Sequence, residues 1–151
     1  MKMLLPIAAL LGVGFFQAPA NPPIKMGLWE SKGTFKMPQA DGTTKDTSRV
    51  MRNCKTPQTW VRMMGPTAKD ACPKTNEVWT KDSYSFDVMC SGKPKMASVS
   101  VQFDSPETEH GTLDMFALPD GSPKKMHQEY TEQWIGADCG DVSPDHPVLV
   151  R

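Results

Sequence analysis

The chain has 151 residues, and its 17 lysines and arginines balance its 17 aspartates and glutamates, so its formal net charge is zero. Because both signs are interspersed along the chain, neither a nucleic-acid partner nor an anionic membrane surface is predicted. The length fits one domain with a single modest core.

The first 20 residues are predicted to be a secretory signal peptide. Lys2 is basic, residues 4–16 form an apolar run, and the tripeptide APA at residues 18–20 is a cleavage site. The run is too short for a comfortable membrane span, and no later segment approaches the roughly 20 apolar residues that a span needs. We therefore expect a mature protein that begins near Asn21, has no membrane span and is periplasmic or secreted.

Residues 27–37 and 43–53 are predicted to form an N-terminal hairpin. In the first segment Trp29, Phe35 and Met37 fall on one face, which is the two-residue period of a strand. The residues between the two segments have turn chemistry.

A short helix is predicted directly after this hairpin. Thr56 is a favoured N-cap, and Pro57 suits the first helical position. Trp60, Met63 and Met64 then fall on one helical face, whose expected role is core packing.

Four cysteines follow the predicted cleavage site, and an oxidising compartment favours pairing them. They are Cys54, Cys72, Cys90 and Cys139. Their spacing lacks the close ligand pairs of a zinc site, and no C-x-x-C redox motif occurs. Two disulfides are therefore predicted.

The pairing follows from a predicted hairpin. Residues 84–90 alternate like a half-buried strand, and a turn centred near Lys81 places Cys72 opposite Cys90 at a separation that suits a disulfide. By elimination, the other two cysteines pair with each other. Loop entropy predicts a stabilisation of about 3 kcal/mol for the short bridge and somewhat over ~4 kcal/mol for the long one.

The clearest strand of the chain is residues 96–103. Its inward positions are predicted to be the apolar ones, and serine and glutamine alternate with them. The inward residues are Ala97, Val99, Val101 and Phe103.

Residues 107–118 and 124–135 are predicted to form the last hairpin, around the turn signal Pro-Asp-Gly. A two-residue turn pairs Met115 with Met126 and lays Tyr130 over Gly111. A three-residue turn instead sets Asp114 against Met126. The first register is mildly preferred because it gathers apolar residues on one face.

These elements predict a mainly β fold, namely an antiparallel, curved, open barrel-like meander of about seven strands with one short helix after the second. Residues 21–142 are expected to form a single disulfide-stapled domain. Residues 143–151 are expected to form an extended C-terminal tail.

Several short motifs carry a family resemblance. They are GLWE at residues 27–30, CKTP at residues 54–57, Cys72, Cys90 and IGADC at residues 135–139. In their order and spacing, over roughly residues 24–140, the chain resembles the bacterial exported family called domain of unknown function 3617. The resemblance implies a secreted or periplasmic, methionine-rich protein with four cysteines, and it implies no established activity or catalytic residues.

No enzyme constellation is evident in the sequence. His127 could face Asp114 across the last hairpin, but no nucleophile motif such as G-x-S-x-G accompanies the pair. A surface ion pair is the expected reading. No catalytic residue, cofactor or metal site is predicted, and a hydrolase with an unrecognised site stays as a further alternative.

The leading hypothesis is a non-catalytic binding or envelope-associated module. It would hold a small apolar ligand within the curved sheet or dock on another envelope protein, and Trp29, Tyr130 and Trp134 are candidate ligand-lining residues. The alternative is copper handling or methionine-based redox chemistry. It draws on the nine methionines that follow the predicted signal peptide, which are scattered along the chain rather than clustered.

Overall fold

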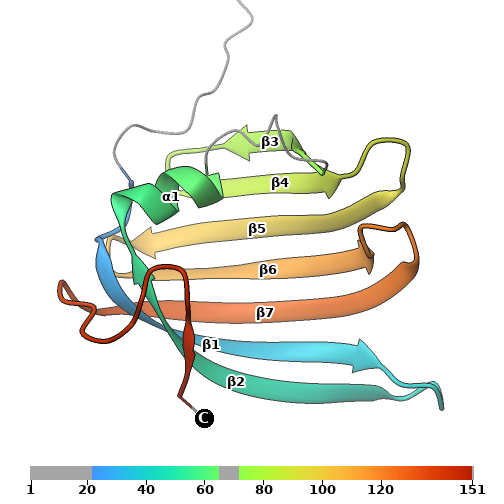
Figure 1. Ribbon diagram of the computed structural model, residues 1–151, viewed down its shortest axis with the longest axis horizontal. Helices are drawn as coiled ribbons and strands as arrows, with labels where there is room; N and C mark the ends of the chain where they lie inside the picture. The colour runs from blue at the N-terminus through green and yellow to red at the C-terminus, as the bar shows by residue number, and fades with distance from the viewer. Residues whose placement is uncertain (1–21, 65–71, 151) are drawn as a thin grey trace, which may run out of the picture.

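A computed structural model describes residues 22–64 and 72–150 (Figure 1). The predicted signal peptide lies outside these residues. No helix in the described part of the chain has the length and apolar character to cross a membrane. The elements are β1 (Gly27–Pro38), β2 (Thr44–Lys55), α1 (Pro57–Met64), β3 (Lys74–Trp79), β4 (Ser83–Met89), β5 (Lys95–Ser105), β6 (Thr108–Ala117), β7 (Pro123–Gly136) and β8 (Val148–Leu149).

The strands form one antiparallel sheet in the order β3-β4-β5-β6-β7-β1-β2-β8 (Figure 1). Strands β3 to β7 follow one another as a meander, and the N-terminal hairpin of β1 and β2 extends the sheet beyond β7. Strands β3 and β8 are the two edges, so the sheet is curved but open. This confirms the predicted mainly β, curved fold, and the short β8 adds one strand to the expected number.

The connection from β2 to β3 crosses the sheet, which sequential hairpins alone did not predict. Strand β2 lies near one edge and β3 forms the other, with α1 between them in sequence. Figure 1 shows α1 against one face of the sheet, which we call the concave face. The crossing therefore places the helix above the inward side chains of the central strands.

The helix begins where the sequence predicted. The Thr56 hydroxyl accepts a hydrogen bond from the Thr59 backbone N–H at 3.2 Å, and the Thr59 hydroxyl accepts one from the Thr56 N–H at 2.8 Å. These reciprocal bonds satisfy donors that a helix start leaves free. Trp60 and Met64 are buried, while Met63 on the same stretch is 45% exposed.

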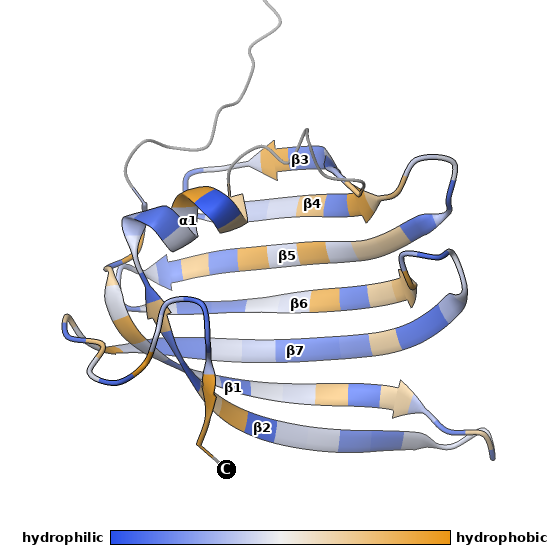
Figure 2. Cartoon of the chain, viewed as in Figure 1, coloured by the Kyte–Doolittle hydropathy of each residue, from blue (hydrophilic) through white to orange (hydrophobic). Residues whose placement is uncertain are grey.

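The core lies between α1 and the β3–β5 part of the concave face. Trp60 packs against Trp79 and Phe103, with ring centroids 6.3 and 5.9 Å away, and Trp79 stacks on the fully buried Tyr84 at 3.8 Å. Along β5 the apolar and polar bands alternate, as Figure 2 shows. Val101 is buried among these rings, which confirms the inward set predicted for this strand.

The β3–β4 hairpin contains a β-bulge that the sequence pattern did not indicate. Val78 pairs with Ser85 near the turn, but Lys74 pairs with Val88 further out, so β3 carries one extra residue between these pairs. Asn76, in the bulge, has a φ of 53°. Continuing the outer register brings Cys72 opposite Cys90, and these two cysteines form a disulfide.

The β6–β7 hairpin combines features of both predicted registers. Its turn has three residues between Leu118 and Ser122, whose backbone N–H and C=O are bonded at 2.9 Å. A bulge beside Ala117 then shifts the pairing, so Met115 faces Met126 as preferred. The strands therefore have the register that gathers apolar residues on one face. The turn has three residues instead of two, and the bulge compensates for the difference.

A second disulfide joins Cys54 at the end of β2 to Cys139 after β7, with Cα atoms 5.6 Å apart. The segment predicted as an extended tail follows this bridge and returns along the sheet. Within it β8 pairs with residues Met51 and Arg52 of β2, and Asp145 forms a 2.5 Å ion pair with Arg62 of α1. The tail and the helix thus meet above the concave face.

Candidate functional site

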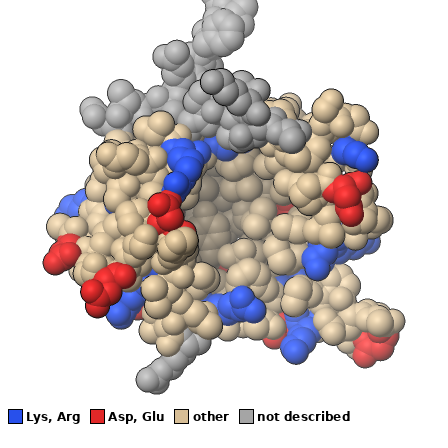
Figure 3. All heavy atoms as spheres, in the orientation of Figure 1, with Lys and Arg blue, Asp and Glu red and all other residues tan. Residues whose placement is uncertain are grey.

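A cavity of about 430 Å³ lies between α1, the C-terminal segment and the concave face. This volume falls within the range typical of small-molecule sites. Figure 3 shows the molecule hollowed near the centre of this face, with uncharged residues around much of the hollow. Met63 and Met64 form the helical wall, Pro144 and Pro147 come from the C-terminal segment, and inward residues of the sheet form the floor.

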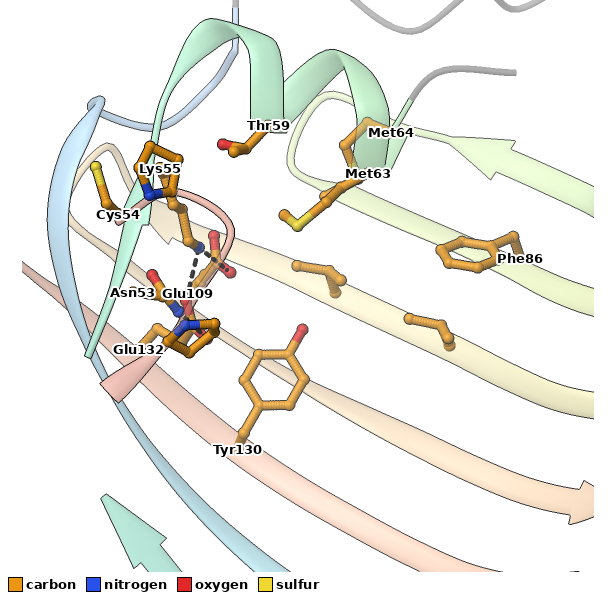
Figure 4. A pocket seen from close by; sticks show the side chains of 14 residues that line it. Asn53, Cys54, Lys55, Thr59, Met63, Met64, Phe86, Glu109, Tyr130 and Glu132 are labelled. Atoms are coloured by element: carbon orange, nitrogen blue, oxygen red, sulfur yellow. Dashed lines mark hydrogen bonds and ion pairs between the residues drawn. The ribbon is translucent and has the colours of Figure 1, made fainter. Parts of the chain in front are cut away.

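The floor is positioned by strand alternation and by register. Val101, Gly111 and Tyr130 lie side by side on β5, β6 and β7. A Cβ added to Gly111 would lie only 2.6 Å from the Tyr130 hydroxyl and 2.4 Å from the Ser100 carbonyl oxygen. The missing side chain thus leaves room for the tyrosine ring, which points from β7 toward Met63 in Figure 4.

One end of the cavity holds a buried cluster of one lysine and two glutamates (Figure 4). The Lys55 ammonium lies 2.7 Å from Glu109 Oε1 and 2.6 Å from Glu132 Oε2. The three side chains are only 7%, 5% and 11% exposed, respectively, so these ion pairs are largely shielded from water. Such buried charges persist only when they are paired.

The neighbours of Lys55 hold it in place. It is the last residue of β2, between the disulfide-bonded Cys54 and the helix cap Thr56. Its ammonium also lies 4.3 Å from the ring centroid of Trp29, which adds a cation–π attraction. The covalent bridge and the helix start therefore fix the backbone that presents the lysine.

The local electrostatics shift the pKa values of two cavity residues upward. Burial raises the pKa of the Glu109 carboxyl, against the lowering effect of Lys55, and Glu132 raises it further. Burial also raises the pKa of the Tyr130 hydroxyl, and the two nearby glutamates add to that effect. Tyr130 therefore offers the cavity a neutral hydroxyl at physiological pH.

Three buried oxygen atoms in this region lack a hydrogen-bond partner among the described residues. They are Glu109 Oε2, Asn53 Oδ1 and Glu132 Oε2, and the last of these is held by its ion pair with Lys55. The Asn53 amide nitrogen donates to Glu132 Oε1 at 3.4 Å, so only its oxygen lacks a partner. Buried acceptors without donors are uncommon in folded proteins.

The three aromatic residues that the sequence predicted as ligand-lining lie in two places. Tyr130 lines the cavity. Trp29 is fully buried beneath Lys55, and its indole N–H donates to the Lys25 carbonyl at 2.9 Å. Trp134 pairs with Trp29 across β1 and β7 and donates to the Met26 carbonyl at 3.0 Å.

The lysine–glutamate cluster was missed at the sequence level. One signal was present: Glu132 is a charged residue at an inward position between Tyr130 and Trp134 on the same strand face. No such signal marks Glu109, because its inward orientation depends on the register of β6. Lys55 could be connected to either glutamate only after the strand order was known.

His127 is not among the residues that line the cavity, and it forms two ion pairs. His127 Nδ1 is 2.6 Å from Asp114 Oδ1, and its Nε2 is 3.1 Å from Glu129 Oε1. This is the cross-strand pairing expected for the last hairpin. Within the described ranges, no three histidine, cysteine, aspartate or glutamate side chains converge as metal ligands do.

Comparison with protein families gives one result. The model of a family described as protein of unknown function (DUF3617) matches residues 24–139. Comparison with curated proteins found no match, and comparison with solved structures found none either. The match covers both cysteines of each disulfide and all but the last strand.

Proposed function

Because the chain belongs to the DUF3617 family, whose function is unknown, we propose a function from the geometry of its cavity. The protein is a non-catalytic, exported binding module that holds a small, mainly apolar ligand between α1 and the concave face. Export is supported by the predicted signal peptide and by two disulfides, which are typical of oxidising compartments.

The observation that carries this proposal is the form of the cavity. Small-molecule sites are clefts or cavities of roughly 300–1,000 Å³, and here about 430 Å³ is open beside the aromatic core. Its walls are apolar, while its polar groups gather at one end, around Glu109 and Tyr130. Apolar walls with a few convergent polar groups are the usual composition of a ligand site.

A titration with Nile red, an uncharged apolar dye, tests the proposal. We expect saturable fluorescence enhancement with one dye per protein. Val99→Trp, on the cavity floor, should weaken dye binding by about tenfold or more because the indole fills the space. Ser100→Trp is the matched control, since the next residue of β5 points to the other face and is exposed.

Dye binding that is absent, or equally strong in both tryptophan variants, would contradict the proposal. Thermal unfolding of each variant shows whether it remains folded. Native mass spectrometry of the purified protein provides a second readout, in which a co-purifying small molecule should be present in the wild type and depleted in Val99→Trp.

Copper or methionine-based redox handling is the alternative function. It would use Met63 and Met64, two thioethers on the helical wall of the cavity. Titration with Cu(I) decides between the two functions. One tightly bound ion that is lost in Met63→Leu would favour metal handling, and unchanged weak binding in that variant would favour the apolar ligand.

A further inference from the structure

The charged end of the cavity has a negative balance. When ionised, Glu109 and Glu132 contribute two negative charges against the single positive charge of Lys55. The ammonium lies within 2.7 Å of both carboxylates, so its charge is already neutralised within the cluster. An anionic head group placed here would meet two carboxylates and no free cation.

The ion pair between α1 and the C-terminal segment does not change this balance. Arg62 on α1 is paired with Asp145 of the C-terminal segment at 2.5 Å, and both side chains are more than half exposed. Their opposite charges offset each other at the rim, where water screens them. The Tyr130 hydroxyl is neutral, as described above. Lys55 is the one lysine or arginine among the described residues that line the cavity, and it is paired with both glutamates.

The unsatisfied atoms of the cluster are all acceptors. Glu109 is 95% buried as a side chain, and when it is ionised its Oε2 has no hydrogen-bond donor among the described residues. Asn53 lines the cavity, and its Oδ1 also has no hydrogen-bond partner among the described residues. An unpaired buried acceptor costs roughly 1–3 kcal/mol, and more when it is charged. A donor at these acceptors would offset that cost, and the negative balance favours a cationic donor.

We propose that the ligand is a cationic amphiphile whose apolar body fills the cavity and whose protonated amine hydrogen-bonds the carboxylates of the Lys55–Glu109–Glu132 cluster. This inference rests on the proposed function and specifies its ligand class. The amine would complete the cluster with two cations against two carboxylates. The apolar body would lie along Val99, Val101 and the methionines of α1.

Four ligands built on a chain of eight carbons test this inference by displacement of Nile red near neutral pH. Octylammonium carries charge and donors, octyltrimethylammonium carries charge without N–H groups, octanol is neutral, and octanoate is anionic. We expect octylammonium to bind about tenfold or more tightly than octanol, because a hydrogen bond to a buried charge is worth roughly 1.5–3 kcal/mol. Octyltrimethylammonium should bind more weakly than octylammonium, and octanoate should bind weakest.

Glu109→Gln tests the residue that carries the inference. The amide keeps an acceptor for Lys55 but removes the charged oxygen, so the preference for octylammonium over octanol should be lost while octanol still binds. Glu107→Gln is the matched control, because Glu107 is half exposed and pairs with Lys25 on the surface. The Glu107→Gln variant should keep the wild-type preference for octylammonium over octanol. Glu132→Gln gives a second variant if the first fails to fold, and there the preference should fall as well.

The outcomes separate the two proposals. Three results would overturn the proposed ligand class but leave the apolar site in place. They are equal affinity for octylammonium and octanol, a higher affinity for octanoate than for octylammonium, and equal affinity for the two cations. A preference that persists unchanged in Glu109→Gln overturns it too. If none of the four ligands displaces the dye, or if the dye does not bind, the proposed function itself fails.

Discussion

Lys55 contributes both to the stability of the fold and to the geometry of the cavity. Its side chain is 7% exposed and bridges two carboxylates that lie on different strands. A buried pair of this kind gives little net stability relative to a packed apolar core, but breaking it leaves an uncompensated charge. The lysine is therefore more important for holding Glu109 and Glu132 together at the cavity than for folding energy as such.

Removing the Lys55 ammonium should destabilise the fold strongly. Lys55→Met leaves two buried carboxylates facing each other, so we expect a loss of about 3–5 kcal/mol in the free energy of unfolding, measured by urea denaturation. The triple variant that adds Glu109→Gln and Glu132→Gln should recover part of this loss.

Arg52→Met is the matched control on the same strand. Arg52 is 44% exposed and lies 3.3 Å from Glu30, so its loss should cost less than about 1 kcal/mol. Equal losses in the two single variants would contradict the buried character of the cluster.

His127 should make stability depend on pH. Hydrogen bonds from the ring to Asp114 and to Glu129 raise the pKa of the His127 imidazole above its ordinary value of 6.5. A raised folded-state pKa contributes stability that is complete below 6.5 and disappears as pH rises through the folded-state pKa. Asp114→Asn should therefore destabilise the protein more near about pH 6 than near about pH 9.

Urea denaturation at both pH values checks this dependence, and NMR titration of the imidazole checks its cause. In Asp114→Asn the His127 pKa should fall toward its ordinary value. A destabilisation that is the same at both pH values would show that the pair acts without protonation.

At the scale of elements, the helix start is the best-specified local structure. The Thr56 and Thr59 hydroxyls each accept a backbone N–H of the other residue. Thr56→Ala should lower the free energy of unfolding by about 1 kcal/mol, the usual cost of losing an N-cap. Gln58→Ala, at an exposed position in the same turn, should have little effect. Chemical denaturation of both variants measures the difference, and equal effects would contradict the capping role.

How well an element could be predicted depends on how much of its signal is local. The alternation of β5 and the cap of α1 are complete within a few residues, so the sequence specified both. The β6–β7 register places Met115 opposite Met126, because this pairing gathers apolar residues on one face of the sheet. The bulge at Asn76 could not be predicted, because an extra residue in one strand is visible only against its partner.

At the scale of the molecule, the position of β1 beside β7 decides the site. This pairing joins the two ends of the family match and brings Glu132 next to the strands that present Lys55. Sequence patterns indicate faces and turns, but they do not report which distant strands are neighbours. The curved fold and the position of Tyr130 on the inward face of the sheet could therefore be predicted from the sequence. The charged cluster could not be predicted.

The two disulfides should differ in their effect on stability. They close loops with sequence separations of 85 for Cys54–Cys139 and 18 for Cys72–Cys90. Loop entropy then predicts losses of about 4.5 and about 3 kcal/mol when each pair is replaced by alanine. Removal of the longer bridge should also weaken Nile red binding, since it frees the backbone at Lys55.

Guanidinium denaturation of the two double alanine variants compares these losses directly. A larger loss for the shorter bridge would mean that local packing, rather than the joining of distant segments, dominates. If the variant without the longer bridge keeps full affinity for Nile red, the Cys54–Cys139 disulfide is not needed to hold the binding site in place.

The central claim is that a ligand occupies the cavity beneath α1, and methyl NMR of methionine-labelled protein tests it most directly. Met63 and Met64 line the cavity, whereas Met89 lies at the end of β4, outside it. On titration with octylammonium, the account predicts shifts and ligand contacts at the Met63 and Met64 methyl groups, with Met89 unchanged. Binding that perturbs Met89 and leaves the two helical methionines unchanged would contradict it.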